Sequence, residues 1–167
     1  MLENRVVAPN NDPLAGKNTG NAQNIAINIA NEIKGNLFSL HVVEKYGTEY
    51  RQVTERAVRE RDSAARPQLE AIPDTSAYDT VFIVFPSWGG TFPMAMATFL
   101  ENSNLEGKTI IPVCTHGGSR LGRSVNDLHS ILRNSNIIDD GLDILGSQAH
   151  SENISNVIKN YLNQVAL

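Results

Sequence analysis

The sequence is poor in the features that mark several large classes of protein. Its 167 residues include one cysteine, Cys114, so no disulfide can form within the chain and nothing calls for an oxidising compartment. No apolar run reaches the length of about 18–20 residues that a membrane-spanning helix needs. The first ten residues also lack the apolar core of a signal peptide. We therefore expect a cytoplasmic protein with no membrane partner, in which Cys114 is a small apolar core residue.

Positive charge is scarce as well. The chain has 14 lysines and arginines against 18 aspartates and glutamates, a formal net charge of −4. Proteins that bind the phosphate backbone of nucleic acids need clustered basic residues. We therefore expect no nucleic-acid partner.

Familiar catalytic and nucleotide-binding motifs are absent too. The sequence contains neither the G-x-G-x-x-G fingerprint nor the G-x-x-x-x-G-K-[ST] loop, so it does not support a nicotinamide or an ATP site. It also lacks a Ser-His-Asp set, histidines and cysteines at metal-ligand spacing, and paired carboxylates in a plausible cleft. We therefore predict no catalytic side chain and no metal ligand.

What the sequence does contain is an alternation of strands and helices. Residues 81–85 and 109–114 are continuous β-branched and aromatic runs, the pattern of strands buried on both faces. Weaker extended segments are expected at 6–8, 37–43, 136–138 and 142–145. Helices are expected at 25–33, 48–64, 93–100, 125–132 and 154–162. Gly35 would close the first helix, and Ser151 would cap the last, whose core face is Ile154, Val157, Ile158, Tyr161 and Leu162. This alternation predicts one α/β domain over residues 1–167 with a parallel sheet covered on both faces.

Three polar or glycine-rich loops, at 17–22, 86–91 and 115–122, follow predicted strands and would meet at the carboxyl edge of that sheet, where such folds bind ligands. In the first loop a helix begins at Asn21, and the free amides of a helix N-terminus favour a phosphate. Thr19 offers a hydroxyl, Gly20 allows close approach or a positive φ, and Lys17 supplies a cation. The alternative is that Thr19 or Asn21 merely caps the helix.

The second loop places Trp88 in a glycine turn, where its planar face would be available to a planar ligand. The alternative is that the indole packs under a neighbouring loop. In the third loop, Gly117 and Gly118 clear the approach surface and leave Thr115 as a donor. His116 could face a ring, but we favour an ordinary surface position for it, and we expect Arg120 and Arg123 to be solvated. Together the loops suit a ligand with a phosphate tail and a flat polycyclic head, of which flavin mononucleotide (FMN) is the obvious candidate.

Several segments resemble the flavodoxin-like family, specifically the small bacterial flavodoxins. They are TGN followed by NIAINIA, ARP at 65–67, YDTVFIVFPSWGGTFPM, GKTIIPVCTHGGSRLGRSVNDL and GLDILGS with its terminal helix, which together span roughly residues 17 to 165. The resemblance implies a doubly wound five-stranded parallel sheet in the order 2-1-3-4-5, with FMN at the switch between the first and third strands. It implies these cofactor-binding residues: Lys17, Asn18, Thr19, Gly20, Asn21, Ala22, Pro86, Ser87, Trp88, Gly89, Gly90, Thr115, His116, Gly117 and Gly118.

The sequence departs from the family pattern at four places. Ala22 stands where the family has a hydroxyl, Lys17 where it has a serine, and Gly89 where a second aromatic commonly follows the tryptophan. The first strand is only Val6–Ala8, followed by Pro9 and a long loop, so residues 1–18 are expected to form an irregular segment with a weak or lost central strand.

The resulting expectation is an FMN-dependent redox protein. It would be an electron carrier or a small reductase of quinone-like acceptors, working with a redox partner protein or a small-molecule electron acceptor, as a monomer or weak dimer. Its modest charge does not separate these two roles. The alternative is a flavodoxin-fold binding or structural module that has lost FMN, which Ala22, Gly89 and the poor first strand would explain.

Overall fold

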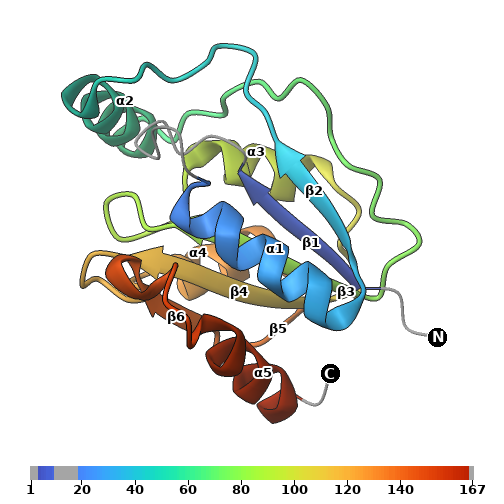
Figure 1. Cartoon of the computed structure of the whole chain (residues 1–167). Helices are drawn as coiled ribbons and strands as arrows, with labels where there is room; N and C mark the ends of the chain where they lie inside the picture. Colours follow the sequence, from blue (N-terminus) through green and yellow to red (C-terminus); the bar gives the residue numbers. More distant parts are fainter. Residues whose placement is uncertain (1–3, 10–18, 166–167) are drawn as a thin grey trace.

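A parallel β-sheet with helices on both faces forms the centre of the protein (Figure 1). The computed structural model describes residues 4–9 and 19–165. The strands are β1 (Asn4–Pro9), β2 (Asn36–Leu40), β3 (Thr80–Pro86), β4 (Thr109–His116), β5 (Asn136–Ile137) and β6 (Leu142–Leu145). Their order is β2-β1-β3-β4-β5, with β6 also pairing with β4, and every pairing is parallel. The predicted doubly wound α/β fold class is confirmed.

The helices divide between the two faces of the sheet. They are α1 (Asn21–Ile33), α2 (Tyr50–Asp62), α3 (Met94–Asn102), α4 (Ser124–Ile131) and α5 (Ile154–Gln164). Helices α1 and α5 lie on one face and α3 and α4 on the other, whereas α2 lies beyond the end to which the strands run (Figure 1). Helix α2 therefore stands over the carboxyl edge, where the candidate loops are.

Strand β3 shows why a continuous apolar run forms the middle of such a sheet. Its side chains alternate between the two faces, so Phe82 and Val84 join the core under α1 and α5. Val81, Ile83 and Phe85 join the core under α3 and α4. All five have no exposed surface, as expected for a strand covered on both sides.

The fifth position of the sheet is shared by two short strands, so the expectation of five strands is wrong in this detail. Strand β5 pairs with Thr109 and Ile110, while β6 pairs from Val113 to His116. Between these two stretches of β4 stands Pro112, which has no N–H to donate. The break in the neighbouring strand falls where β4 cannot support a ladder.

The first strand is longer than expected. Strand β1 runs from Asn4 to Pro9 and pairs with both β2 and β3, so it occupies the central position itself. The expectation of an irregular segment therefore fails for residues 4–9. The long loop expected after Pro9 lies outside the described residues.

Two expected helix ends are also corrected. Lys34, not Gly35, takes the left-handed conformation that ends α1, with φ of 54°. Asn153, not Ser151, precedes α5, and Val157 is 37% exposed rather than part of the core face. The 48–64 helix is the shorter α2.

Candidate functional site

A pocket of about 400 Å³ lies at the carboxyl edge of the sheet, which we call the edge pocket. Segments that follow five different strands meet there, as expected for a fold of this type. The pocket is lined by Asn21, Tyr50, Val53, Thr54, Ala57, Val58, Arg61, Pro86, Ser87, Trp88, Gly89, Thr115, His116, Gly117 and Gly146. Eight of the fifteen candidate residues are thus brought together: Asn21, Pro86, Ser87, Trp88, Gly89, Thr115, His116 and Gly117.

The first wall of the edge pocket, which we call the sheet wall, is formed by the segments that follow β3 and β4. The Ser87 N–H donates to the Thr115 carbonyl (2.7 Å), which extends the pairing of these strands beyond their regular ends. The hydroxyls of Ser87 and Ser119 lie 2.8 Å apart. The Trp88 N–H donates to the Thr91 carbonyl (2.8 Å) and closes the intervening turn. Both loops are therefore fixed directly to buried strands.

Glycine is required in the turn after Trp88. Gly89 and Gly90 have φ of 64° and 83°, in the left-handed region that side chains rarely adopt. Trp88 itself is half-buried and lines the edge pocket. Its ring and that of Tyr46 form a T-shaped pair, with a centroid distance of 5.1 Å and an interplanar angle of 85°. The indole thus packs against a neighbouring loop and also faces the pocket, which combines the two alternatives drawn from the sequence.

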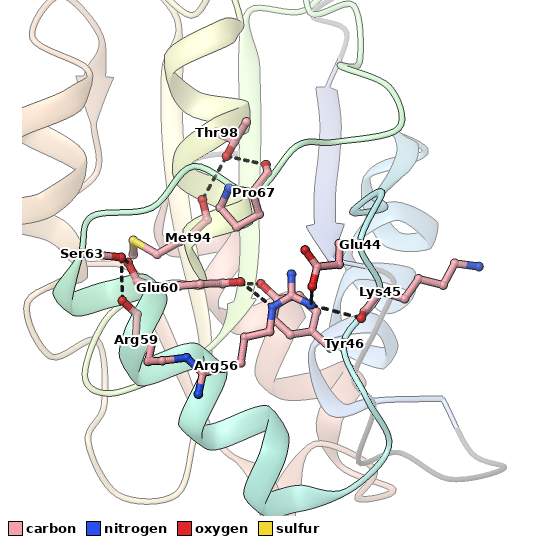
Figure 2. Close-up of polar contacts among 10 residues, drawn as sticks. All are labelled: Glu44, Lys45, Tyr46, Arg56, Arg59, Glu60, Ser63, Pro67, Met94 and Thr98. Atoms are coloured by element: carbon pink, nitrogen blue, oxygen red, sulfur yellow. Dashed lines mark hydrogen bonds and ion pairs between the residues drawn. The ribbon is translucent and has the colours of Figure 1, made fainter.

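Tyr46 is held by two side chains of α2 (Figure 2). Its hydroxyl donates to Glu60 Oε2 (2.6 Å), and the guanidinium of Arg56 lies 4.1 Å from its ring centroid. Arg56 Nε also donates to Glu60 Oε1 (2.7 Å). Burial and the Glu60 carboxylate raise the pKa of Tyr46 well above its ordinary value, so the hydroxyl stays protonated. This Tyr46–Arg56–Glu60 cluster connects α2 to Trp88.

The second wall is one face of α2, and it was not predicted from the sequence. The α2 wall consists of Tyr50, Val53, Thr54, Ala57, Val58 and Arg61. These positions follow the spacing of a single helical face. The apolar residues Val53, Ala57 and Val58 within an otherwise charged helix were the available signal. Gly146, which follows β6, was also missed.

His116 is buried, so the expectation of a surface position is wrong. Its Nδ1 accepts the Gly118 N–H (3.0 Å), and its Nε2 lies 3.0 Å from Asp143 Oδ1. Because Nδ1 accepts a hydrogen bond, the ring is the neutral tautomer with its proton on Nε2, donated to Asp143. The His116 side chain is 6% exposed, and its ring fixes the backbone turn after β4. Arg120 and Arg123 are exposed, as expected.

At the start of α1, the capping alternative is not supported. Gly20 is the N-cap, and no side chain makes a capping hydrogen bond. Its φ is −59°, so a positive φ is not the reason for glycine here. The first intrahelical bond runs from the Asn24 N–H to the Gly20 carbonyl (2.8 Å), so the amides of Asn21 and Ala22 have no acceptor within the helix. Asn21 lines the edge pocket, and exposed Thr19 does not.

The remaining candidate residues lie elsewhere. Ala22 is 4% exposed and packs in the core under α1 and α5. Gly90 uses its carbonyl to accept the Arg123 N–H (2.9 Å), and Gly118 uses its N–H on His116. Neither glycine lines the edge pocket. Lys17 and Asn18 lie outside the described residues.

Cys114 is fully buried beneath the sheet wall, as expected for a small apolar core residue. Burial, together with nearby Asp143, raises the pKa of its thiol to about 12. Among the described residues, no group of three or more acidic, histidine or cysteine side chains could hold a metal ion. Within the same part of the chain, each helix is too short or too polar to span a bilayer.

Solved structures of other proteins share this fold. A candidate flavoprotein from Bacteroides eggerthii is 22% identical, with a TM-score of 0.78 over 100% of this chain and 99% of that one. A second, from Bacteroides uniformis, is 24% identical, with a TM-score of 0.76 over 95% of this chain and 98% of that one. A Lactobacillus acidophilus flavoprotein solved in complex with FMN is 18% identical, with a TM-score of 0.65 over 89% of this chain and 96% of that one.

No curated protein matches the sequence. The family model described as flavodoxin, however, matches residues 17–161, which covers most of the chain and includes every loop of the edge pocket. The chain therefore belongs to the flavodoxin family.

Proposed function

We propose that the edge pocket binds FMN and that the protein carries out redox chemistry through the bound flavin. The observation that carries the proposal is the meeting of Asn21, Trp88 and Gly117 around one pocket at the carboxyl edge of the sheet. Membership of the flavodoxin family and the FMN complex of the similar Lactobacillus acidophilus flavoprotein support FMN as the cofactor.

The residues of the pocket fit the two halves of FMN. Near Asn21 the α1 N-terminus offers backbone amides and the positive end of the helix dipole, which suit a phosphate. Trp88 offers a planar apolar surface to a flat ring. Gly117 lines the pocket, and a Cβ added to it would meet no atom within 4 Å, so the backbone of this loop is open to approach. A pocket of about 400 Å³ is within the size range of cofactor sites.

Bound FMN would supply the electron chemistry, and the side chains of this chain would bind, orient and shield it. The sheet wall fixes the position of Trp88 through the Ser87–Thr115 and Trp88–Thr91 hydrogen bonds. The α2 wall excludes water with Val53, which is 2% exposed, and Ala57. Electron transfer to a redox partner and reduction of a quinone-like molecule are the two reactions this arrangement supports.

Titration of FMN with the purified protein, followed by flavin fluorescence, tests the proposal. We expect saturable quenching at micromolar protein, with weaker binding of riboflavin, which lacks the phosphate. Gly117→Leu should weaken or abolish quenching because it adds bulk and restricts the backbone at a residue that lines the pocket. Gly47→Leu is the matched control: its Cβ would meet only the flexible end of Gln52, 3.1 Å away and outside the pocket, so binding should be retained.

The rival function is a module of the same fold that has lost FMN. It predicts no quenching of FMN by the wild-type protein at any micromolar concentration. Equal quenching by the wild-type protein and Gly117→Leu would also contradict the proposal, because FMN would then be bound outside the edge pocket.

A further inference from the structure

The lining of the edge pocket has an uneven charge. Among the described residues that line it there is one arginine, Arg61, and no aspartate or glutamate. His116 also lines the pocket, but its Nδ1 accepts a backbone N–H and its ring is therefore neutral. Among the described residues, Arg61 is consequently the charged side chain of this lining, and a guanidinium is a permanent cation.

Arg61 reaches the sheet wall from the opposite side of the pocket. Its Nη1 lies 3.4 Å from the Gly89 carbonyl oxygen, directly beside Trp88 in the chain. A Cβ built on Gly89 would collide with this guanidinium. The space that a side chain at position 89 would enter is thus filled by a planar cation from α2.

The cation is held in place but only partly neutralised. Arg61 pairs with Asp62, with Nη2 and Oδ1 2.7 Å apart. The Asp62 side chain is 61% exposed and does not line the pocket, whereas that of Arg61 is 27% exposed. Solvent screens the carboxylate more than the guanidinium. The carboxylate of Asp143, 3.0 Å from His116 Nε2, also lies outside the lining.

This charge matters because the flavin ring changes charge on reduction. Hydride transfer brings two electrons and one proton, so a neutral oxidised ring becomes a reduced ring with one negative charge. A fixed cation near that ring stabilises the reduced form more than the oxidised form. A carboxylate-lined pocket would do the reverse.

We propose that Arg61 stabilises the reduced, anionic flavin and thereby adapts the site to two-electron transfer from a hydride donor to a quinone-like acceptor. The inference rests on the proposed binding of FMN. With FMN bound, the donor would lose a hydride to the oxidised flavin. The acceptor would then take two electrons and one proton from the reduced flavin and a second proton from water, and would leave as the quinol.

The test measures the two-electron midpoint potential of the FMN complex and that of free FMN under anaerobic conditions. The difference between the two potentials gives how much more tightly the protein binds reduced FMN than oxidised FMN. Arg61→Gln should weaken binding of reduced FMN relative to oxidised FMN by about tenfold, which corresponds to a potential lowered by about 30 mV. Arg61→Lys should largely retain the wild-type potential. Asp62→Asn removes the partner of the cation and should raise the potential, a change that a purely structural role for Arg61 would not produce.

The outcomes separate this inference from the proposed function. A wild-type protein that does not bind oxidised FMN overturns both. FMN binding with the same potential in the wild-type protein and in folded Arg61→Gln overturns the inference alone, as does a potential that falls in Asp62→Asn. A fall in Arg61→Gln, retention in Arg61→Lys and a rise in Asp62→Asn support it.

Discussion

The two walls of the edge pocket are built in different ways. The sheet wall follows directly from β3 and β4, whose central side chains have essentially no exposed surface. The α2 wall belongs to a helix in which only Val53 and Glu60 are buried. Polar contacts hold the Tyr46–Arg56–Glu60 cluster together (Figure 2), and the Tyr46 ring joins it to Trp88 of the sheet wall. One wall is fixed by apolar packing, the other by charged and aromatic contacts.

This difference indicates a division of roles. Apolar packing on both faces of a strand gives a rigid platform, which suits the positioning of a ring by Trp88. A helix with few buried contacts opens locally at a lower free-energy cost. Its solvent-facing positions can also carry charged side chains, such as that of Arg61, without disturbing the core. We therefore expect mutations in the sheet wall to change folding and affinity, and mutations in the α2 wall to change mainly local order and redox properties.

The largest effect is expected where the sheet wall meets the core. Phe85→Ala should lower the free energy of unfolding by about 3–5 kcal/mol, because it removes a fully buried ring from a central strand. Val58→Ala in the α2 wall, where the side chain is 44% exposed, should change it by less than about 0.5 kcal/mol. Urea unfolding followed by circular dichroism measures both. Equal losses would contradict the contrast between the walls.

The next effect concerns affinity. Trp88→Ala should weaken FMN binding by about 1–3 kcal/mol, or roughly 5- to 150-fold, because a planar contact surface is lost. Tyr50→Ala should have a much smaller effect, since this ring on the α2 wall is 67% exposed. Quenching of flavin fluorescence gives both dissociation constants. A larger loss in Tyr50→Ala than in Trp88→Ala would place the ring against α2 rather than against the sheet wall.

Smaller effects are expected at the contact that joins the walls. Tyr46→Phe keeps the ring contact with Trp88 but removes the 2.6 Å hydrogen bond to Glu60, which should destabilise α2 by about 1–2 kcal/mol. Faster hydrogen exchange confined to α2 is the expected result. Tyr161→Phe is the matched control, because it removes a buried hydroxyl that donates to the Asp140 carbonyl (3.1 Å) far from the pocket. If Tyr161→Phe has the same effect on α2 exchange, the cluster does not hold the helix.

The last prediction concerns how stability depends on pH in the alkaline range. Burial raises the pKa of Cys114 in the sheet wall to about 12 from an ordinary value of 9.0. Above pH 9 the unfolded chain loses this proton while the folded protein retains it, so stability falls as pH rises from about 9 to about 12. The slope from this group approaches about 1.4 kcal/mol per pH unit at most. Comparison of unfolding free energies at pH 8 and pH 10 should show a smaller fall in Cys114→Ala than in the wild-type protein, and an unchanged fall would contradict the assignment.

The sequence predicted the sheet wall better than the α2 wall, for a physical reason. A strand buried on both faces must be continuously apolar, so Val81–Phe85 and the glycine turn after it were recognisable from residue types alone. The helix over 48–64 was also recognised, but which of its faces covers the pocket depends on the path of the chain between β2 and β3. No local pattern determines that path.

The errors have similar origins. His116 looked like a surface residue because its partners, Asp143 and the Gly118 N–H, are brought to it only by the pairing of β4 with β6 and by the turn that follows. Ala22 and Gly89 looked like losses from a binding site. In the structure Ala22 packs in the core, and the space beside Gly89 is filled by Arg61. Comparing single residues with a family pattern does not detect that a side chain from another element, such as Arg61, fills the space.

The central claim is that FMN binds between Trp88 and α2, and the emission of Trp88 tests it most directly because this is the chain's one tryptophan. During an FMN titration, we expect tryptophan emission to be quenched at a 1:1 stoichiometry with the same dissociation constant that flavin fluorescence gives. Flavin binding that leaves the emission of Trp88 unchanged, or an absence of binding at micromolar concentrations, would contradict the account.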